Sequence, residues 1–415
     1  MEISGYLRDK KAWLAPLVAV TLCMALLLWL ISANWLAGNP ASEQEESLAV
    51  EHEQAAVVQQ GKGQWIEAAS LRGKAIEIRE ALALAHPTDA NVIDQVAASY
   101  LDLGTFWREM GERTKAEAAF HKAIEIRERL VRDHSNNEAY SDRLAACYQG
   151  LAEAQRQLGE PAAAMTSSRK AIEIRELLMR DRPASAEFQE HLAGSYIDLS
   201  YSQRQLGQSD GLLDSHRKAI EIREQLVRNN PQAIQYKNDL AGAYADLGLL
   251  ERDLALPAES EAAFRKAAEW REELVRENPA VADFQERLAA TYEDLASSQQ
   301  RVNRLADALL SRRKVIEARK QLAQDHPTES RFLDLVAAAY VDCGVLQREM
   351  NHYDESKDSL QHAIEIRERL VKSHPGTGSY QENLAWCYWH LAITAQSAGE
   401  SDAALTTCQK AIAIT

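Results

Sequence analysis

Apolar side chains along most of this chain recur at intervals of three and four residues, the spacing of one face of an α-helix. In 92–110 they fall at Val96, Tyr100 and Leu103, and in 114–131 alanine, phenylalanine and isoleucine continue the same rhythm. A glycine separates the two segments. In six other repeats a proline follows the second segment and ends it, because proline lacks an amide donor, whereas Ser135 stands at that position here. The pattern predicts two antiparallel helices of about 20 residues each.

This pair of helices repeats along the chain with a constant period. The segment KAIEIRE begins at positions 74, 122, 170 and 218, so each copy starts 48 residues after the one before it. One hairpin cannot bury its apolar stripe alone, so neighbouring hairpins must stack to form a continuous core. The sequence therefore predicts an all-α fold, a solenoid of helical hairpins. Copies of the segment stand at 74–80, 122–128, 170–176 and 218–224, with looser forms at 266–272, 314–320 and 362–368.

The residues at fixed positions of the period resemble a tetratricopeptide repeat. That family places leucine–glycine and an aromatic residue on the first helix, then alanine, an aromatic residue and alanine on the second. The resemblance covers about 42–415 in eight units, the first and last atypical, and implies a curved superhelix whose first helices line a concave groove for a peptide or a partner helix. In one unit the matching residues are Leu103, Gly104, Trp107, Ala116, Phe120 and Ala123.

The repeat is longer than the family's usual 34 residues. The extra length corresponds to about two turns in each helix, which leaves each apolar stripe facing the same way. HEAT-like helical pairs have a period nearer to this one, but they lack the Leu-Gly…Ala…Ala pattern. Long units of this kind resemble those attached to bacterial membrane-anchored serine/threonine kinases. No kinase domain is expected here, because the chain has no Gly-rich loop and no HRD or DFG sequence.

An uncharged segment near the N-terminus predicts a membrane anchor. Residues 13–37 are long enough to cross a hydrocarbon core of about 30 Å as a helix. Basic residues precede the segment and glutamates follow it, so the N-terminus is expected in the cytoplasm and the array on the outer, periplasmic or extracytoplasmic, side. A cleaved signal peptide ending at 31–33 is the alternative. The predicted segments are a tail (1–12), a transmembrane helix (13–37), a linker with a degenerate first helix (38–63) and the repeat array (64–415).

Composition and motifs argue against several function classes. The formal net charge is −15 and no basic stripe is present, so nucleic-acid binding is not expected. The five cysteines form no CxxC pair and no cluster with histidine, so no metal site is predicted. A disulfide between Cys387 and Cys408 stays open. No catalytic or cofactor-binding motif appears, so we predict neither an enzyme nor a cofactor.

The recurring charges have two interpretations. In KAIEIRE, glutamate precedes arginine by two positions, so the two side chains lie on different sides of one helix. We favour an ion-pair ladder in which the arginine reaches a neighbouring repeat, and a ligand contact is the alternative.

The first helices carry two further rows of charge. A structural interpretation pairs the aspartate of one unit with the arginine of the next. The alternative is a row of arginines that offers bidentate contacts to a partner's carboxylates. The Lys/Asn pattern of chaperone-binding members is absent from the matching positions. The aspartates are Asp102, Asp198, Asp246, Asp294 and Asp342, and the arginines are Arg108, Arg156, Arg204, Arg252 and Arg348.

Other positions on the first helices vary between repeats, as a recognition surface would require, although relaxed constraint predicts the same. Trp386 and Trp389 replace smaller residues in the last unit, either as an interface hot spot or as a plug for the open end of the stack. By the period, the last helix would run past Thr415, so self-association through this unit is a further hypothesis. The varying row comprises Thr105, Glu153, Tyr201, Leu249, Ser297, Val345 and Ile393.

Together these features predict a membrane-anchored scaffold for protein–protein interaction, with peptide segments or partner helices held by the first helices. The alternative is an architectural, self-associating membrane protein whose groove is not used.

Overall fold

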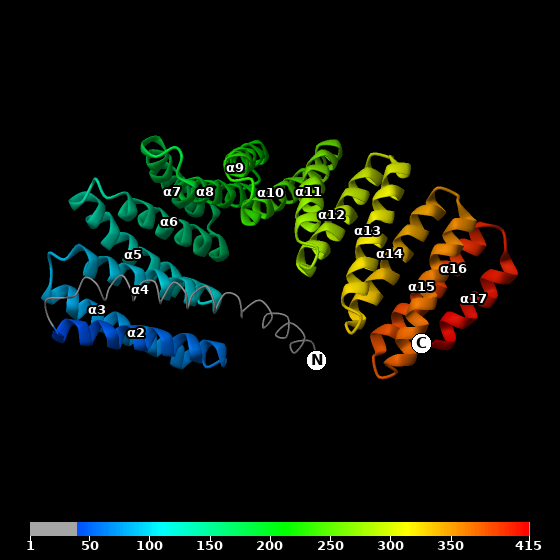
Figure 1. The fold of residues 1–415 in the computed structure, drawn as a ribbon, viewed down its shortest axis with the longest axis horizontal. Coiled ribbons are helices and arrows are strands. Elements are labelled where there is room, and N and C mark those ends of the chain that lie inside the picture. The colour runs from blue at the N-terminus through cyan, green and yellow to red at the C-terminus, as the bar shows by residue number, and fades with distance from the viewer. Residues whose placement is uncertain (1–39, 415) are drawn as a thin grey trace. The chain divides into compact units, whose positions relative to one another are not determined.

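The computed structural model describes residues 40–414, which form sixteen α-helices (Figure 1). The helices alternate as first and second members of eight hairpins, as the period predicts. The first helices are α2 (Pro40–Gly61), α4 (Ala90–Glu109), α6 (Glu138–Leu158), α8 (Ala186–Gln205), α10 (Ile234–Asp253), α12 (Ala282–Arg301), α14 (Ser330–Glu349) and α16 (Gly378–Ser397). The second helices are α3 (Trp65–Ala85), α5 (Arg113–Asp133), α7 (Pro161–Asp181), α9 (Ser209–Asn229), α11 (Pro257–Glu277), α13 (Leu305–Asp325), α15 (Tyr353–Ser373) and α17 (Ser401–Ile414).

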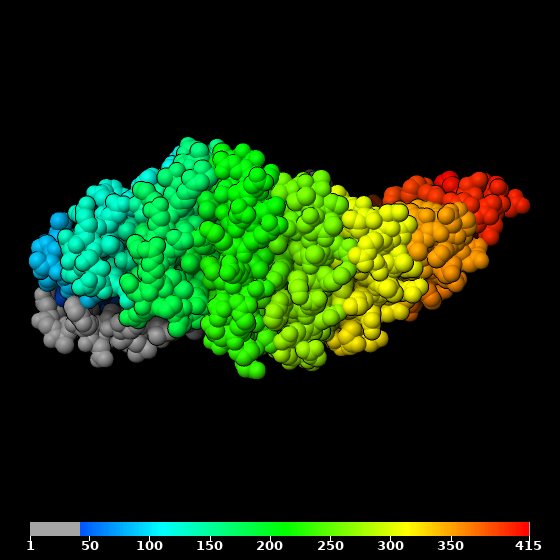
Figure 2. Space-filling model, turned by 90° about the horizontal axis from the view of Figure 1, so that it is seen from above, coloured from blue at the N-terminus to red at the C-terminus, as the bar shows by residue number. Residues whose placement is uncertain are grey.

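The array divides into two compact units, one ending at Gln208 and the other beginning at Ser209. Within each unit, every helix packs against the helices that precede and follow it. Successive first helices also contact one another directly, α4 with α6, α6 with α8, and α14 with α16. In the second unit the hairpins follow one another in chain order, from green through yellow and orange to red (Figure 2).

The turn inside each hairpin uses a left-handed backbone conformation at one position of the period. Glycine occupies it in five hairpins, where φ lies between 68° and 83°. Ala255, Asn303 and Asn351 occupy the same position with φ of 58°, 58° and 61°. Glycine adopts this conformation without a steric penalty, and asparagine tolerates it better than alanine. The five glycines are Gly63, Gly111, Gly159, Gly207 and Gly399.

The leucine–glycine pair on the first helix makes room for an aromatic ring of the second. A Cβ atom added to Gly104 would lie 2.8 Å from the ring of Phe120, which is fully buried between α4, α5 and α6. Gly248 and Phe264 repeat this arrangement. Where the first helix has Ala152, the second has only a buried serine at the facing position. In these hairpins the size of one residue therefore compensates for the size of the other.

No helix within residues 40–414 is long and apolar enough to cross a membrane. The predicted transmembrane helix at 13–37 and the tail at 1–12 lie outside the described residues. The helix expected to be degenerate, near 42–61, is α2.

We predict that Gly104→Ala lowers the free energy of unfolding by about 1–3 kcal/mol, because the added methyl group would displace the Phe120 ring. Gly242→Ala is the matched control, since a Cβ atom there would meet no atom within 4 Å. It should raise the free energy of unfolding by about 0.5–1 kcal/mol through the lower chain entropy of the unfolded state. Urea unfolding measures both, and a stabilising Gly104→Ala would contradict this account of the packing.

Candidate functional site

The arginine of the KAIEIRE segment joins three helices at once. Arg127 on α5 donates from Nε to Asp94 Oδ1 on α4 at 3.0 Å. Its Nη1 donates to the Arg143 carbonyl of α6 at 3.0 Å and to Cys147 Sγ at 3.1 Å. One guanidinium thus ties a second helix to its own first helix and to the next one. The same bond to the carbonyl sixteen residues downstream recurs at Arg127, Arg175, Arg223, Arg271, Arg319 and Arg367.

This arginine is most deeply buried where an acid on the preceding first helix faces it. Arg79, Arg127, Arg175 and Arg367 are buried, and each pairs with an acid thirty-three residues upstream. Arg271 makes no ion pair within residues 40–414 and is only half-buried. Burial and the nearby Arg287 lower its pKa to about 10. The arginine therefore reaches the neighbouring repeat, as the ladder interpretation expects, but it does so through a hydrogen bond to a backbone carbonyl. Its ion pair lies within its own hairpin, so the predicted ion pair between repeats is wrong. The four acids are Glu46, Asp94, Asp142 and Asp334.

The two glutamates of the segment have different surroundings. The second one accepts a hydrogen bond from the recurring tyrosine of the next first helix, as Glu80 does from Tyr100 at 2.7 Å and Glu368 from Tyr388 at 2.6 Å. Burial, followed by the bond to Glu80, raises the pKa of Tyr100 to about 12. The first glutamate is exposed in all seven copies of the segment. The arginine and the second glutamate of the repeated segment therefore serve the stacking of hairpins.

The arginine row on the first helices is also tied to neighbouring helices. Arg252 Nη1 on α10 donates to Asp294 Oδ1 on α12 at 2.7 Å. Arg156 on α6 lies 3.8 Å from Asp198 Oδ1 on α8, and its guanidinium lies over the ring of Tyr201. The direction is the reverse of the predicted one, because the arginine belongs to one hairpin and the aspartate to the next.

The remaining members of these rows have varied surroundings. Arg108 pairs with Glu153, since glycine occupies the aspartate position of the following hairpin. Asp342 accepts from Arg312 of a second helix at 3.2 Å. Asp102 is exposed on α4. Arg204 and Asp246 lie on α8 and α10 at the positions that the period assigns to them.

Trp386 and Trp389 come together on α16 and form an exposed aromatic pair. Their rings stack with centroids 4.6 Å apart and planes at 24°. The two residues are 53% and 43% exposed, so they present a surface to solvent. Both rings contact the buried His390 edge-on, with centroids 4.8 and 4.9 Å away. Sequence reasoning did not single out His390, although the period shows that it occupies the aspartate position of the last hairpin.

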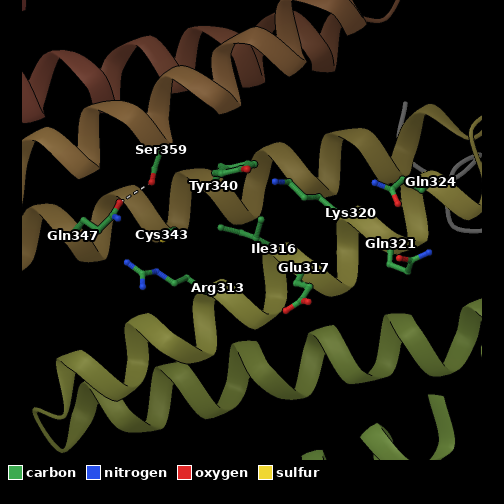
Figure 3. A pocket seen from close by; sticks show the side chains of 10 residues that line it. All are labelled: Arg313, Ile316, Glu317, Lys320, Gln321, Gln324, Tyr340, Cys343, Gln347 and Ser359. Carbon is green, nitrogen blue, oxygen red and sulfur yellow. Dashed lines mark hydrogen bonds between the residues drawn. The ribbon is translucent and has the colours of Figure 1, made fainter. Parts of the chain in front are cut away.

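A hollow recurs between consecutive second helices. One of about 470 Å³ lies over α14 between α13 and α15, and one of about 570 Å³ lies over α6 between α5 and α7. Figure 3 shows the first, where Lys320 lies near Tyr340 and Ser359 donates to Gln347 at 2.7 Å. Eight of its ten lining residues share repeat positions with residues that line the second. The hollow is therefore a product of stacking that the repeats have in common.

Possible metal ligands meet once within residues 40–414, at Asp142, Glu187 and His191, whose ligand atoms lie within 4.8 Å of one another. Asp142 is already bonded to Arg175 at 3.3 Å and to His191 at 2.9 Å. We therefore assign this carboxylate to the link between hairpins. Cys387 and Cys408 are both free and form no disulfide with each other, and Cys387 Sγ accepts a hydrogen bond from Arg367 at 3.0 Å.

Three segments of the chain match sequence profiles of the tetratricopeptide repeat: residues 96–136, 145–176 and 337–369. They coincide with the hairpins α4–α5, α6–α7 and α14–α15. No sequence among curated proteins matches the chain. The chain thus contains tetratricopeptide repeats within an array of sixteen helices.

Solved structures show distant similarity. The apo form of the quorum sensor NprR from B. thuringiensis is 13% identical with a TM-score of 0.43, over 100% of this chain and 99% of that chain. The apo form of RapI is 12% identical with a TM-score of 0.45, over 77% and 76%. BtubC from P. vanneervenii is 18% identical with a TM-score of 0.40, over 60% and 89%. The assignment of the repeat rests on the three matched segments.

We predict that Asp198→Asn stabilises the protein at pH 7. Burial raises the pKa of Asp198 from its ordinary value of 3.8 to about 6, against the opposing effects of Gln149 and Arg156. The folded state then holds a proton that the unfolded state has lost, so stability falls as pH rises from about 4 to about 6. Asparagine carries no charge and can still accept the hydrogen bond from Gln149 Nε2, which is 2.6 Å long.

Urea unfolding of Asp198→Asn should show a gain of about 1–2 kcal/mol at pH 7 that disappears near pH 4. Asp294→Asn is the control and should lose stability at pH 7, because Asp294 accepts a charge-assisted bond from Arg252. A gain for Asp198→Asn that is equal at both pH values would rule out ionisation as its cause.

Proposed function

We propose that this protein is a membrane-anchored scaffold that mediates protein–protein interaction through the first helices of its repeats. The observation that carries the proposal is the contrast between two surfaces. The KAIEIRE segments are nearly constant, and their arginines and second glutamates bond to neighbouring helices. All seven residues of the varying row, from Thr105 to Ile393, are half-buried, so they are within reach of a partner.

Tetratricopeptide-type hairpins suit this role because successive first helices contact one another, as α4 and α6 do in the first unit and α14 and α16 do in the second. A peptide segment or a partner helix lying along these first helices would meet a different residue in each repeat. The partner would therefore be selected by the varying row, while the nearly constant second helices hold that row in place. We further propose that the 48-residue unit is a long variety of the tetratricopeptide repeat, and that the protein acts without catalysis.

The anchoring is proposed from the sequence. Residues 13–37 are uncharged, basic residues precede them and acidic residues follow. The array would then lie on the outer, periplasmic or extracytoplasmic, side of the membrane. Self-association through the last hairpin belongs to the alternative architectural function. The exposure of Leu405 on α17 and of the tryptophan pair on α16 is consistent with it.

Site-specific photo-crosslinking in cells tests the proposal. We expect benzoylphenylalanine in place of Ser297, on the varying row, to give heteromeric adducts. The same group in place of Glu269, an exposed first glutamate on α11, should give few or none. Adducts at twice the mass of the chain would favour the architectural alternative. Equal yields of heteromeric adducts from the two positions would contradict a binding surface on the first helices.

A further inference from the structure

The last two first helices, α14 and α16, lack the ion pair that joins an arginine of one first helix to an aspartate of the next in earlier repeats. Arg252 meets Asp294 forty-two residues downstream, and Arg156 meets Asp198 at the same separation. The residue at that separation from Arg348 is His390. Within residues 40–414, Arg348 makes no ion pair, and its Nη1 is buried without a hydrogen-bond partner. The Arg348 guanidinium thus lacks the carboxylate partner that Arg252 and Arg156 have at the equivalent positions.

The imidazole that replaces the carboxylate is also unsatisfied. His390 is 8% exposed, and its Nδ1 is buried without a partner. Burial, followed by the charge of Arg348, lowers the pKa of His390 to about 4. The ring is therefore neutral near pH 7 and does not add a second positive charge beside the guanidinium. Two polar groups from adjacent first helices, α14 and α16, share one junction and lack partners there.

An apolar surface adjoins this junction. Trp386 and Trp389 stack on each other and contact His390 edge-on, and both are exposed. At the position of Trp386 the earlier repeats have only small residues, such as Gly242 and Ala338. The aromatic pair is therefore confined to the hairpin in which a histidine replaces the aspartate. Exposed tryptophan beside an arginine is typical of residues that dominate protein interfaces.

We infer that Arg348, His390, Trp386 and Trp389 form a binding site for a protein segment in which an acidic side chain adjoins an apolar one. The partner's carboxylate would take the place opposite Arg348 that the Asp294 carboxylate takes opposite Arg252. A guanidinium favours carboxylate over neutral groups because it offers paired, charged donors. The neutral imidazole would add no opposing charge, and the neighbouring apolar side chain would lie on the exposed tryptophan pair. This inference rests on the proposed function and specifies part of its surface.

The charge requirement can be tested with a defined probe. The full-length protein is labelled with 5-fluorotryptophan, and the Trp386 and Trp389 ¹⁹F resonances are assigned with the Trp→Phe variants. It is titrated with a capped hexapeptide that contains one Glu-Leu pair, and with the same peptide carrying Gln-Leu. We expect the Glu peptide to shift both resonances and to bind at least tenfold more tightly than the Gln peptide. Amidation of the C-terminus in both peptides ensures that the side chain supplies the carboxylate.

Two variants separate binding from folding. In His390→Asp the new carboxylate should pair with Arg348, as Asp294 pairs with Arg252. This variant should therefore have a higher Tm and should bind the Glu peptide at least tenfold more weakly. Arg348→Gln should weaken binding similarly. Arg252→Gln is the matched control and should leave binding unchanged, because Asp294 already occupies that guanidinium.

Three results would overturn the inference: no shift with the Glu peptide at millimolar concentration, equal binding of the two peptides, or full binding by His390→Asp. If crosslinking from Ser297 succeeds while one of these results is found, this site fails and the proposed function stands. If both experiments fail, the proposed function fails with it.

Discussion

A buried guanidinium linking three consecutive helices is the interaction on which the stacking of this array depends. Arg127 makes all three contacts of this kind. It donates to the Asp94 carboxylate, to the Arg143 backbone carbonyl and to the Cys147 sulfur. The buried carbonyl and carboxylate each require a partner, and removing the arginine would leave both unsatisfied. The carbonyl bond fixes the position of one hairpin on the next, because it is directed at one residue of the following helix.

This constraint explains why the second helices vary so little. Ala123 and Ile124 fill the core, Arg127 links the helices, and Glu128 receives the tyrosine hydroxyl of the next hairpin. The residues of this segment that face a neighbouring helix are therefore not available to select a partner. Under the proposed function, selection falls to the first helices, whose varying row is half-buried. Arg348, which makes no ion pair within residues 40–414, lies on one of these first helices, and we infer that a partner's carboxylate binds opposite it.

The sequence was sufficient to predict the helices, their pairing and the period, because apolar spacing and proline positions are local signals. It did not predict the partners of the arginines. The period places Arg252 and Asp294 in equivalent rows, but the tilt between hairpins decides which neighbour each one reaches, and that tilt depends on packing. Ala255 shows a related limit, because the left-handed turn is set by its neighbours and tolerates a residue that does not favour it. His390 could have been found by counting along the aspartate row.

A double-mutant cycle at Arg367 and Asp334 tests most directly whether the guanidinium link holds the hairpins together. The Arg367 Nε and Asp334 Oδ1 atoms lie 3.0 Å apart. Urea unfolding of Arg367→Met, Asp334→Leu and the double variant gives the coupling energy. We predict losses of about 3–5 kcal/mol for each single variant and a coupling energy of about 2–3 kcal/mol, since the double variant leaves no unpaired buried charge. Losses that add to within about 0.5 kcal/mol would contradict the account.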